Sequence, residues 1–298
     1  MVKRDTKVRL LGHGLKNKGN DCFFNSVMQC VLSVVDLTTF YSENRFNDKQ
    51  VASKGFQSFI EEYKSSNPLS PESFITTLRP KIALLNGKQQ DSHEFLITFI
   101  DLLFKELTNA TREVINSSTE YNRIKLNNFI ADTFFGLQQT TVICGTCLNK
   151  STSPSIFSIL TLPVTNDLND SIYLYSKETL LQGQDQFKCN TCSYSKASKH
   201  SIDVLCYPKI LVIHLMRFSG AFRKIDDPIN IPRELTLNKE KYDVFGLTCH
   251  SGVLSSGHYV SYSKRNSVWY YFNDSSVTKI ESPPLRKSDA YLVFYERR

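Results

Sequence analysis

The chain has 298 residues, with 36 lysines and arginines against 29 aspartates and glutamates, a formal net charge of +7. Hydrophobic residues make up 41% and aromatic residues 12%, which excludes an intrinsically disordered chain and predicts a buried core. No apolar run approaches the ~18 residues that a membrane-spanning helix needs, so no membrane partner is expected. The N-terminal segment MVKRDTKVRL has no apolar core, so no secretory signal is expected and we predict an intracellular protein, cytoplasmic or nuclear.

Basic residues are spread thinly along the chain, and no cluster of five or more lysines and arginines is present. A net positive charge permits contact with nucleic acid, but a thin distribution favours an ordinary solvated surface. No specific nucleic-acid partner is therefore expected.

The first part of the chain, to about residue 110, has the apolar spacing of helices. One helical face begins at Cys22 and consists of Phe24, Val27, Met28, Val31, Val34 and Val35. Ser70 followed by Pro71 is typical of a helix start and predicts a helix through Leu84. Another helix is predicted to begin near Asp91 and to bury Phe95, Leu96, Phe99, Leu102 and Leu103.

Short β-like runs replace the helical pattern after Asp132. They cover 134–142, 156–162, 210–218, 257–263, 268–272 and 290–295. Helices gathered first and strands later predict an α+β fold with separate helical and β layers.

Four of the eight cysteines form two C-x-x-C pairs, Cys144 with Cys147 and Cys189 with Cys192. In a chain without a secretory signal, such pairs favour a zinc site over disulfides. Two tight turns that each offer two thiolates make a tetrahedral shell with no open position, so we expect one structural zinc per chain. Four unrelated buried thiols, or a redox C-x-x-C, are weaker interpretations, because the spacing repeats and neither pair opens a helix.

Cys22 stands where a polar, glycine-containing loop runs into the first apolar helix. A thiol at a helix N-terminus feels the positive end of the helix dipole, which favours the nucleophilic thiolate. Asn17, in the same loop, offers an amide that can donate to a developing oxyanion. Cys30, further along the helix, is predicted to be only a small buried hydrophobe.

A cysteine nucleophile needs a general base, and the chain has six histidines. His13 and His200 are predicted to lie on the surface, and His93 and His214 in the packed core. His250 and His258 remain. A strand that begins at His258 would form a hairpin with the strand that ends at Asn273 and Asp274, which places a histidine beside a residue pair that can orient it.

These motifs, in this order, resemble those of the ubiquitin-specific proteases, a family of papain-like deubiquitinating enzymes. The family's cysteine motif is similar to GLKNKGNDCFFNSVMQC here, and its central motif to QQDSHEF. Its histidine motif is similar to GHYVSYS followed by WYYFNDSSV and AYLVFYER, and PKILVIHLMRF resembles the strand before its blocking loop. One departure is Asp21, where many members carry Thr, and this acid is expected to raise the pKa of the neighbouring Cys22.

The resemblance, which runs from Gly14 to Glu296, implies a role for each motif. Cys22 would be the nucleophile, His258 the general base and Asn17 the oxyanion donor. Asn273 would orient the imidazole by accepting its Nδ1 hydrogen. Asp274 would lie behind it, near Asn17, because successive side chains of a regular strand point to opposite faces.

The fold that the resemblance implies is α+β and papain-like. It has a helical thumb at 1–133, zinc-bearing β fingers at 134–205 and a β palm at 206–298, within a single catalytic domain. The four cysteines of the two pairs would bind zinc at the tip of the fingers.

Asp91 and Glu94 have two interpretations. Their spacing is that of a capping box at a helix start, which alone would account for both carboxylates. The resemblance instead implies that they bind the arginine-bearing C-terminal tail of ubiquitin. Tyr259, next to His258, would line the narrow channel for that tail.

Three classes of function remain open. The first is a thiol-dependent deubiquitinase that hydrolyses the isopeptide or peptide bond after the C-terminal glycine of ubiquitin, with ubiquitin and ubiquitinated proteins as partners. The second is a catalytically impaired ubiquitin-binding scaffold of the same fold, against which the intact set of Cys22, His258 and Asn273 argues. The third is a zinc-ribbon protein that binds nucleic acid, which the thin charge distribution disfavours.

Overall fold

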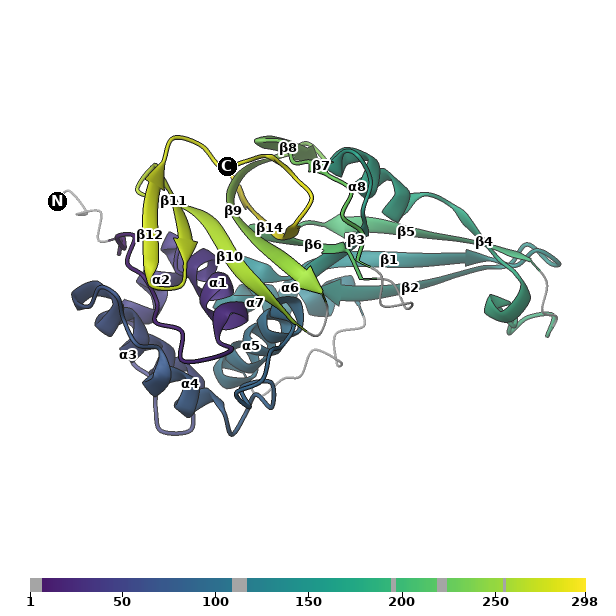
Figure 1. Ribbon diagram of the computed structural model, residues 1–298. Coiled ribbons are helices and arrows are strands. Elements are labelled where there is room, and N and C mark those ends of the chain that lie inside the picture. The colour runs from purple at the N-terminus through teal and green to yellow at the C-terminus, as the bar shows by residue number, and fades with distance from the viewer. Residues whose placement is uncertain (1–6, 109–116, 194–196, 219–223, 254–255) are drawn as a thin grey trace.

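Helices form the first layer of the structure, as the sequence predicts. The computed structural model describes residues 7–108, 117–193, 197–218, 224–253 and 256–298. In Figure 1 the purple and blue helices of the first part of the chain lie together on one side of the molecule. They are α1 (Cys22–Val31), α2 (Val35–Glu43), α3 (Val51–Ser65), α4 (Glu72–Leu78), α5 (Ser92–Leu107), α6 (Ser118–Asn127) and α7 (Phe129–Phe134), and α8 (Leu168–Ser176) follows between strands.

The helix that begins at Cys22 is shorter than its apolar pattern. The pattern continues to Val35, but α1 ends at Val31. Ser33 leaves the helix there, and its Oγ lies 3.0 Å from Oγ of Ser263 in the sheet. The helix predicted to begin near Asp91 is confirmed, because α5 starts directly after this residue.

The helix predicted through Leu84 is also shorter, because α4 ends at Leu78. Pro80 follows two residues later, and a proline has no N–H with which to continue the helical ladder. The expected cap at Ser70 is wrong by one residue. Pro71 occupies the N-cap position and makes no side-chain capping bond.

A narrow antiparallel sheet follows the helices, with the strand order β2-β1-β5-β4. In Figure 1 its long strands project away from the helices toward the right-hand end of the molecule. The strands are β1 (Gly136–Ile143), β2 (Lys150–Phe157), β4 (Thr179–Leu181) and β5 (Ser198–Cys206). The run predicted at 134–142 therefore begins later than expected, since Phe134 still belongs to α7.

The run predicted as one strand at 156–162 is two strands in two sheets. β2 ends at Phe157, and β3 (Ile159–Pro163) begins after the buried Ser158. β3 pairs in parallel with β6 (Ile210–Met216), so the chain crosses from the narrow sheet to the large one at this serine.

The large sheet has eight strands in the order β12-β11-β10-β9-β14-β6-β3, with β8 also paired to β9. Its remaining strands are β8 (Glu234–Leu237), β9 (Glu240–Val253), β10 (Ser256–Arg265), β11 (Val268–Asn273), β12 (Ser276–Ile280) and β14 (Ala290–Arg297). Four of the predicted runs coincide with β6, β10, β11 and β14, whereas the central strand β9 was not predicted. The α+β class with separate layers is confirmed.

Every residue of α1 is buried, because the helix lies between the helical layer and the large sheet. On one side Phe24 packs against the rings of Phe59 and Phe74, and Phe23 meets Phe95 edge to face. On the other side α1 contacts β9 and β10. Among the described residues no single helix is both long and apolar enough to cross a membrane, and α1 with α2 meets that test only as a pair bent by 88°.

A buried arginine fixes the C-terminal end of α1 to the sheet. Arg265, at the end of β10, is 4% exposed. Its guanidinium donates to the carbonyl oxygen of Gln29 at 2.9 Å, to Oε1 of Gln29 at 2.5 Å and to the carbonyl oxygen of Leu11 at 2.6 Å. The same group bonds to the hydroxyl of Tyr63 and stacks against Phe272. One cation thus joins the N-terminal segment, two helices and the sheet.

We predict that Arg265→Met lowers the free energy of unfolding by about 3 kcal/mol, because several buried acceptors lose a charged donor at once. Urea denaturation of the purified variant measures this change. The matched control is Lys264→Met at the neighbouring exposed position, which should change stability by no more than about 0.5 kcal/mol. Equal losses of stability in the two variants would contradict the role of Arg265 in joining α1 to the sheet.

Candidate active site

Cys22 is the first residue of α1 and is 4% exposed. Burial raises the pKa of its thiol above the ordinary value, and the charge of Asp274 raises it further, whereas backbone hydrogen bonding at Tyr259 acts in the opposite direction. Burial is thus the largest influence on this pKa, and it acts against the thiolate that a helix N-terminus favours. The acid whose charge raises this pKa is Asp274, while the carboxylate of Asp21, the chain neighbour of Cys22, accepts from the N–H of Lys18.

His258 lies beside Asn273, as the predicted hairpin requires. Nε2 of His258 is 2.7 Å from Oδ1 of Asn273. An amide oxygen only accepts hydrogen bonds, so the hydrogen is on Nε2. The sequence prediction that Nδ1 contacts Asn273 is wrong, because Nε2 of the ring makes this contact. Nδ1 does not bond to Asn273 and is left for another partner.

Asp274 also approaches the imidazole, because the chain leaves the strand at this residue. β11 ends at Asn273, and Asp274 has a left-handed backbone with φ 51°. The alternation of a regular strand no longer applies there. Oδ2 of Asp274 is 4.0 Å from Nε2 of His258 and accepts from Nδ2 of Asn17 at 2.9 Å. The expected contact between Asp274 and Asn17 is confirmed.

A residue that the sequence analysis did not single out completes this group. Nδ2 of Asn25, on α1, donates to Oδ1 of Asp274 at 2.7 Å. Both carboxylate oxygens are thus held by asparagines from the segment around Cys22. The only signal in the sequence is that Asn25 lies one helical turn after the cysteine, on the same face.

The amide oxygen of the Asn17 side chain shapes the loop before α1. Oδ1 of Asn17 accepts from the N–H groups of Gly19 at 2.9 Å and Asp21 at 3.1 Å. Because Oδ1 is occupied by the loop, the amide group turns its nitrogen toward Asp274. One hydrogen of that nitrogen remains for another acceptor.

The other histidines are engaged elsewhere. His93 and His214 stack with ring centroids 3.9 Å apart, and burial lowers the pKa of His214 to about 3, which fits the packed core predicted for them. Burial lowers the pKa of His250 to about 4, with a further contribution from Lys224. His13 is half-buried rather than on the surface, and its Nδ1 lies 2.9 Å from the carbonyl oxygen of Tyr63.

A hollow of about 190 Å³ lies beside Tyr259, the chain neighbour of His258. Asp91 caps α5 at its rim, since Oδ1 accepts from the N–H of His93 at 2.7 Å, and Oδ2 accepts from the hydroxyl of Tyr291 at 2.6 Å. Glu94 is exposed, and Tyr259 is 7% exposed. The residues that line the hollow are Gln89, Gln90, Asp91, Glu94, Phe218, His250 and Tyr259.

One lining residue bridges the helical layer and the sheet. Oε1 of Gln89 accepts from the N–H of Gly257 at 2.8 Å, and its Nε2 donates to the carbonyl oxygen of Gly257 at 3.1 Å. Gly257 directly precedes His258. In the sequence Gln89 stands out only as part of the QQDSHEF motif, because nothing there indicates a partner so far along the chain.

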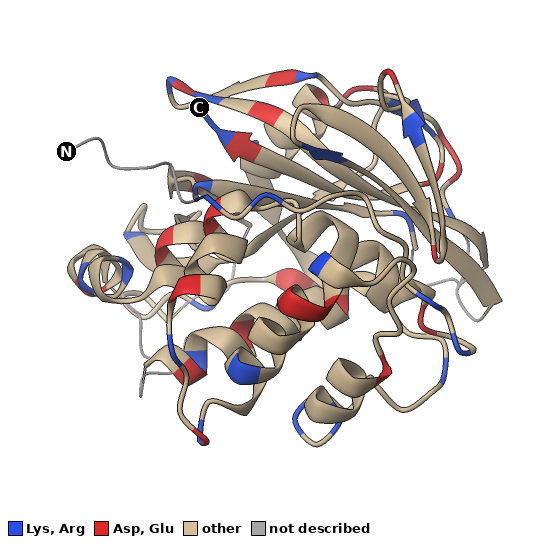
Figure 2. Cartoon of the chain, turned by 90° about the vertical axis from the view of Figure 1, so that its left-hand side faces the viewer, with Lys and Arg blue, Asp and Glu red and all other residues tan. Residues whose placement is uncertain are grey.

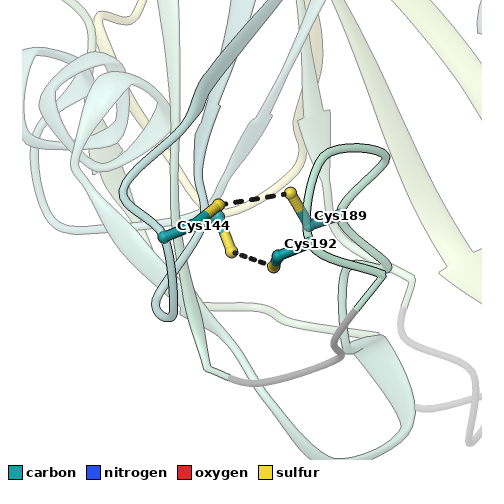
Figure 3. A group of neighbouring side chains, drawn as sticks. Cys144, Cys189 and Cys192 are labelled. Atoms are coloured by element: carbon teal, nitrogen blue, oxygen red, sulfur yellow. Dashed lines mark hydrogen bonds between the residues drawn. The ribbon is translucent and has the colours of Figure 1, made fainter.

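The two C-x-x-C pairs meet at the far end of the narrow sheet, where Figure 3 shows sulfurs from the two turns facing one another. All four sulfurs lie within 4.8 Å of one another. Sγ of Cys144 is 3.8 Å from Sγ of Cys192, and Sγ of Cys147 is 3.7 Å from Sγ of Cys189. Four sulfurs at about 2.3 Å from a metal form a tetrahedron with edges of ~3.8 Å, so this donor set fits a four-thiolate metal site.

The two turns are built alike. The N–H of Thr146 donates to Sγ of Cys144, and the N–H of Thr191 to Sγ of Cys189, each at 3.4 Å. Backbone N–H groups of Cys147 and Thr146 lower the pKa of Cys144 to about 6. No disulfide joins any of the eight cysteines, all of which are described. The turns therefore favour a thiolate, the form that binds a metal, at the first cysteine of each pair, Cys144 and Cys189.

Relatives with a similar sequence share one description. A ubiquitin carboxyl-terminal hydrolase from Arabidopsis thaliana, number 16, is 29% identical over 98% of this chain and 31% of its own length. Ubiquitin carboxyl-terminal hydrolase 2 from Homo sapiens is 30% identical over 95% of this chain and 54% of its own length. The chain thus spans about a third to about half of the length of these two relatives.

Solved structures show the same fold. A SAGA DUB module bound to monoubiquitin matches with a TM-score of 0.80 at 23% identity, covering 100% of this chain and 72% of the other. A yeast SAGA DUB module with a mutant Sgf73 matches with a TM-score of 0.79 at 26% identity, covering 96% and 68%. The sequence model described as ubiquitin carboxyl-terminal hydrolase matches residues 13–295. The resemblance noted in the sequence is confirmed, and the chain belongs to the ubiquitin carboxyl-terminal hydrolase family.

Proposed function

We propose that the protein is a thiol-dependent deubiquitinase that hydrolyses the isopeptide or peptide bond after the C-terminal glycine of ubiquitin. The observation that carries this proposal is that Cys22, at the start of a buried helix, lies against the backbone of Tyr259 and feels the charge of Asp274, the chain neighbours of the paired His258 and Asn273. The family supports the reaction class. The hollow beside the site supports an extended peptide tail as the group that binds.

The reaction would proceed in two halves. Sγ of Cys22 attacks the glycine carbonyl carbon while Nδ1 of His258 takes the thiol proton, and Asn17 donates its remaining amide hydrogen to the oxyanion. His258 then gives the proton to the leaving amine, and a thioester with Cys22 remains. Water deprotonated by His258 attacks the thioester, and the returned proton restores the thiol. Asn273 and Asp274 would hold the imidazole and stabilise its charged form.

The tail of ubiquitin would enter through the hollow at Asp91, Glu94 and Tyr259. Two carboxylates at its rim can bind a basic tail, and the buried Tyr259 leaves little room for side chains. A related structure is bound to monoubiquitin, which supports ubiquitin and ubiquitinated proteins as the partners.

The four clustered cysteines would hold one structural zinc per chain. Zinc supplies a rigid tetrahedral node, and Cys144, Cys147, Cys189 and Cys192 would bind it through their thiolates. The helical part at 1–133 would act as a thumb, the part at 134–205 as fingers and the part at 206–298 as a palm. β3 and α8 lie within the second range, but β3 pairs with the large sheet.

Two alternatives make different predictions. A catalytically impaired scaffold would bind ubiquitin without reacting. The hydrogen bond between His258 and Asn273 disfavours this alternative, because it orients a general base. A nucleic-acid binder needs a continuous basic surface, whereas Figure 2 shows blue and red segments interspersed. Free cysteines and a ubiquitin substrate support a location inside the cell, cytoplasmic or nuclear.

The test is the reaction of the purified protein with ubiquitin that carries an electrophilic C-terminus. A covalent adduct on Cys22, located by mass spectrometry, is the expected result. Binding without an adduct would support the scaffold. Neither binding nor an adduct would overturn the assignment to ubiquitin.

Cys22→Ala should lower turnover of a ubiquitin–fluorophore conjugate by about 10⁴-fold or more, with ubiquitin binding retained, since only the nucleophilic sulfur is lost. Cys30→Ala is the matched control, because Cys30 is buried in the same helix and should keep its activity per folded molecule. Comparable turnover by both variants would rule out Cys22 as the nucleophile.

Elemental analysis should find about one zinc per chain. Cys144→Ser should lower zinc content and folded yield more than it changes the catalytic step. Cys206→Ser removes a cysteine outside the cluster and should keep the zinc. A folded, fully active protein without metal would contradict a structural role.

Asp91→Asn should raise KM for ubiquitin substrates, since the charge is lost while the amide oxygen still caps α5. Glu94→Gln should act in the same direction. Asp91→Ala loses both functions and should also cost about 1 kcal/mol of stability by thermal denaturation. If Asp91→Asn unfolds the protein but spares the activity of the folded fraction, capping is the only role of this residue.

Asn273→Ala should lower kcat with little effect on ubiquitin binding, by less than the ~10⁴-fold that a lost charged orienting residue costs in serine triads. Asn273→Asp should be tolerated, because a carboxylate also accepts from Nε2. Steady-state kinetics of Asn273→Ala and Asp274→Ala on one substrate make the comparison. If Asp274→Ala is far more damaging while Asn273→Ala resembles the wild type, Asp274 is the residue that orients His258.

A further inference from the structure

Asn25 is a buried amide that the proposed reaction does not use. It is 2% exposed and lies on α1 one turn after Cys22. Its Nδ2 donates to Oδ1 of Asp274 at 2.7 Å and is 3.5 Å from the carbonyl oxygens of Leu15 and Lys16. The side chain therefore reaches across from the cysteine helix to the end of β11.

The Asp274 carboxylate connects both halves of the site. Asn25 holds one of its oxygens and Asn17 the other, while the imidazole of His258 lies 4.0 Å from the oxygen that Asn17 holds. The carbonyl oxygen of Asp274 also accepts from the N–H of Leu15 at 2.9 Å. The carboxylate thus stands between the segment that carries the nucleophile and the strands that carry the general base.

We propose that Asn25 is a positioning residue, whose amide fixes the Asp274 carboxylate and thereby sets His258 against Cys22. This role rests on the proposed deubiquitinase function. Asn17 alone would leave the carboxylate free to rotate about a single hydrogen bond. With Asn25 on the second oxygen, the carboxylate plane has one orientation relative to α1.

The amide oxygen of Asn25 argues against a purely stabilising role for this side chain. Oδ1 of Asn25 is buried and has no hydrogen-bond partner among the described residues. A buried acceptor without a partner costs stability, which an apolar side chain at the same place would avoid. Asn25 therefore serves its donor contact with Asp274 at the expense of stability.

The experiment compares Asn25→Ala with Ser26→Ala. Ser26 is the matched control, because it is 3% exposed on the same helix and its hydroxyl donates to the carbonyl oxygen of Phe23, away from Asp274. Asn25→Ala should lower kcat on a ubiquitin–fluorophore conjugate by about tenfold with KM nearly unchanged, while Ser26→Ala keeps the wild-type kcat. Asn25→Asp, which sets a second carboxylate against Asp274, should be at least as damaging.

A double-mutant cycle with Asp274→Ala decides whether the effect runs through the carboxylate. Once Asp274 is gone, adding Asn25→Ala should lower kcat by less than about twofold. Independent, multiplying effects would overturn the proposal, as would an unchanged kcat in Asn25→Ala. A loss of thermal stability in Asn25→Ala that accounts for the lost activity would also overturn it.

A second readout needs no turnover and separates this proposal from the proposed function. Iodoacetamide alkylates Cys22 at a rate that follows thiolate formation, and mass spectrometry locates the product. Asn25→Ala should shift the pH midpoint of alkylation upward, because the Asp274 charge loses a donor, and should shift nothing in the Asp274→Ala background. If the variants show these shifts but the wild type cleaves no ubiquitin conjugate, only the proposed function is contradicted. The same shift in both backgrounds would contradict the role of Asn25.

Discussion

The structure depends on a helix with no exposed residue, held at both ends by one hairpin. At the C-terminal end of α1, Arg265 of β10 binds the carbonyl oxygen and the side chain of Gln29. Near its N-terminal end, Asp274 at the end of β11 accepts from Asn25. β10 and β11 also carry His258 and Asn273. Because the helix that presents Cys22 and the hairpin that presents His258 are fastened twice, the two groups keep a fixed relation.

Much of the site could be predicted because its residues lie in local patterns. A cysteine at a loop–helix junction, a histidine at a strand start and paired C-x-x-C turns each combine an unusual residue with a recognisable boundary. The helix boundaries were less predictable, since the apolar pattern after Cys22 runs past the point where Ser33 turns toward the sheet. Contacts with distant partners decide such ends, and a pattern of neighbours does not contain them.

The parts that the sequence did not indicate are those that long-range contacts create. β9 is the central strand, and its middle residues are buried without interruption, so the alternation by which a half-buried strand is recognised is absent. Arg265 follows Lys264 in a short polar run and resembles ordinary surface charge, yet it is buried. Asn25 resembles any polar residue of a helix until Asp274, 249 residues away in the chain, lies against it.

The cysteines show how strongly the surroundings decide reactivity. In the C-x-x-C turns, backbone N–H groups point at the sulfur and lower the pKa of Cys144 to about 6. At Cys22 burial dominates and raises the pKa, even though the residue begins a helix. The first arrangement suits a thiolate that binds a metal permanently, while the second keeps a neutral thiol until a base takes its proton.

Asp274 acts on both partners of that proton transfer. Its charge raises the pKa of the Cys22 thiol, and its Oδ2 lies 4.0 Å from Nε2 of His258. In the proposed reaction, a thiolate formed by loss of its proton to solvent would add a second negative charge near this carboxylate, whereas transfer of the proton to His258 would place a positive charge between the two. We infer that attack and proton transfer to His258 are coupled, so that the nucleophile is generated against the substrate carbonyl and not before it arrives.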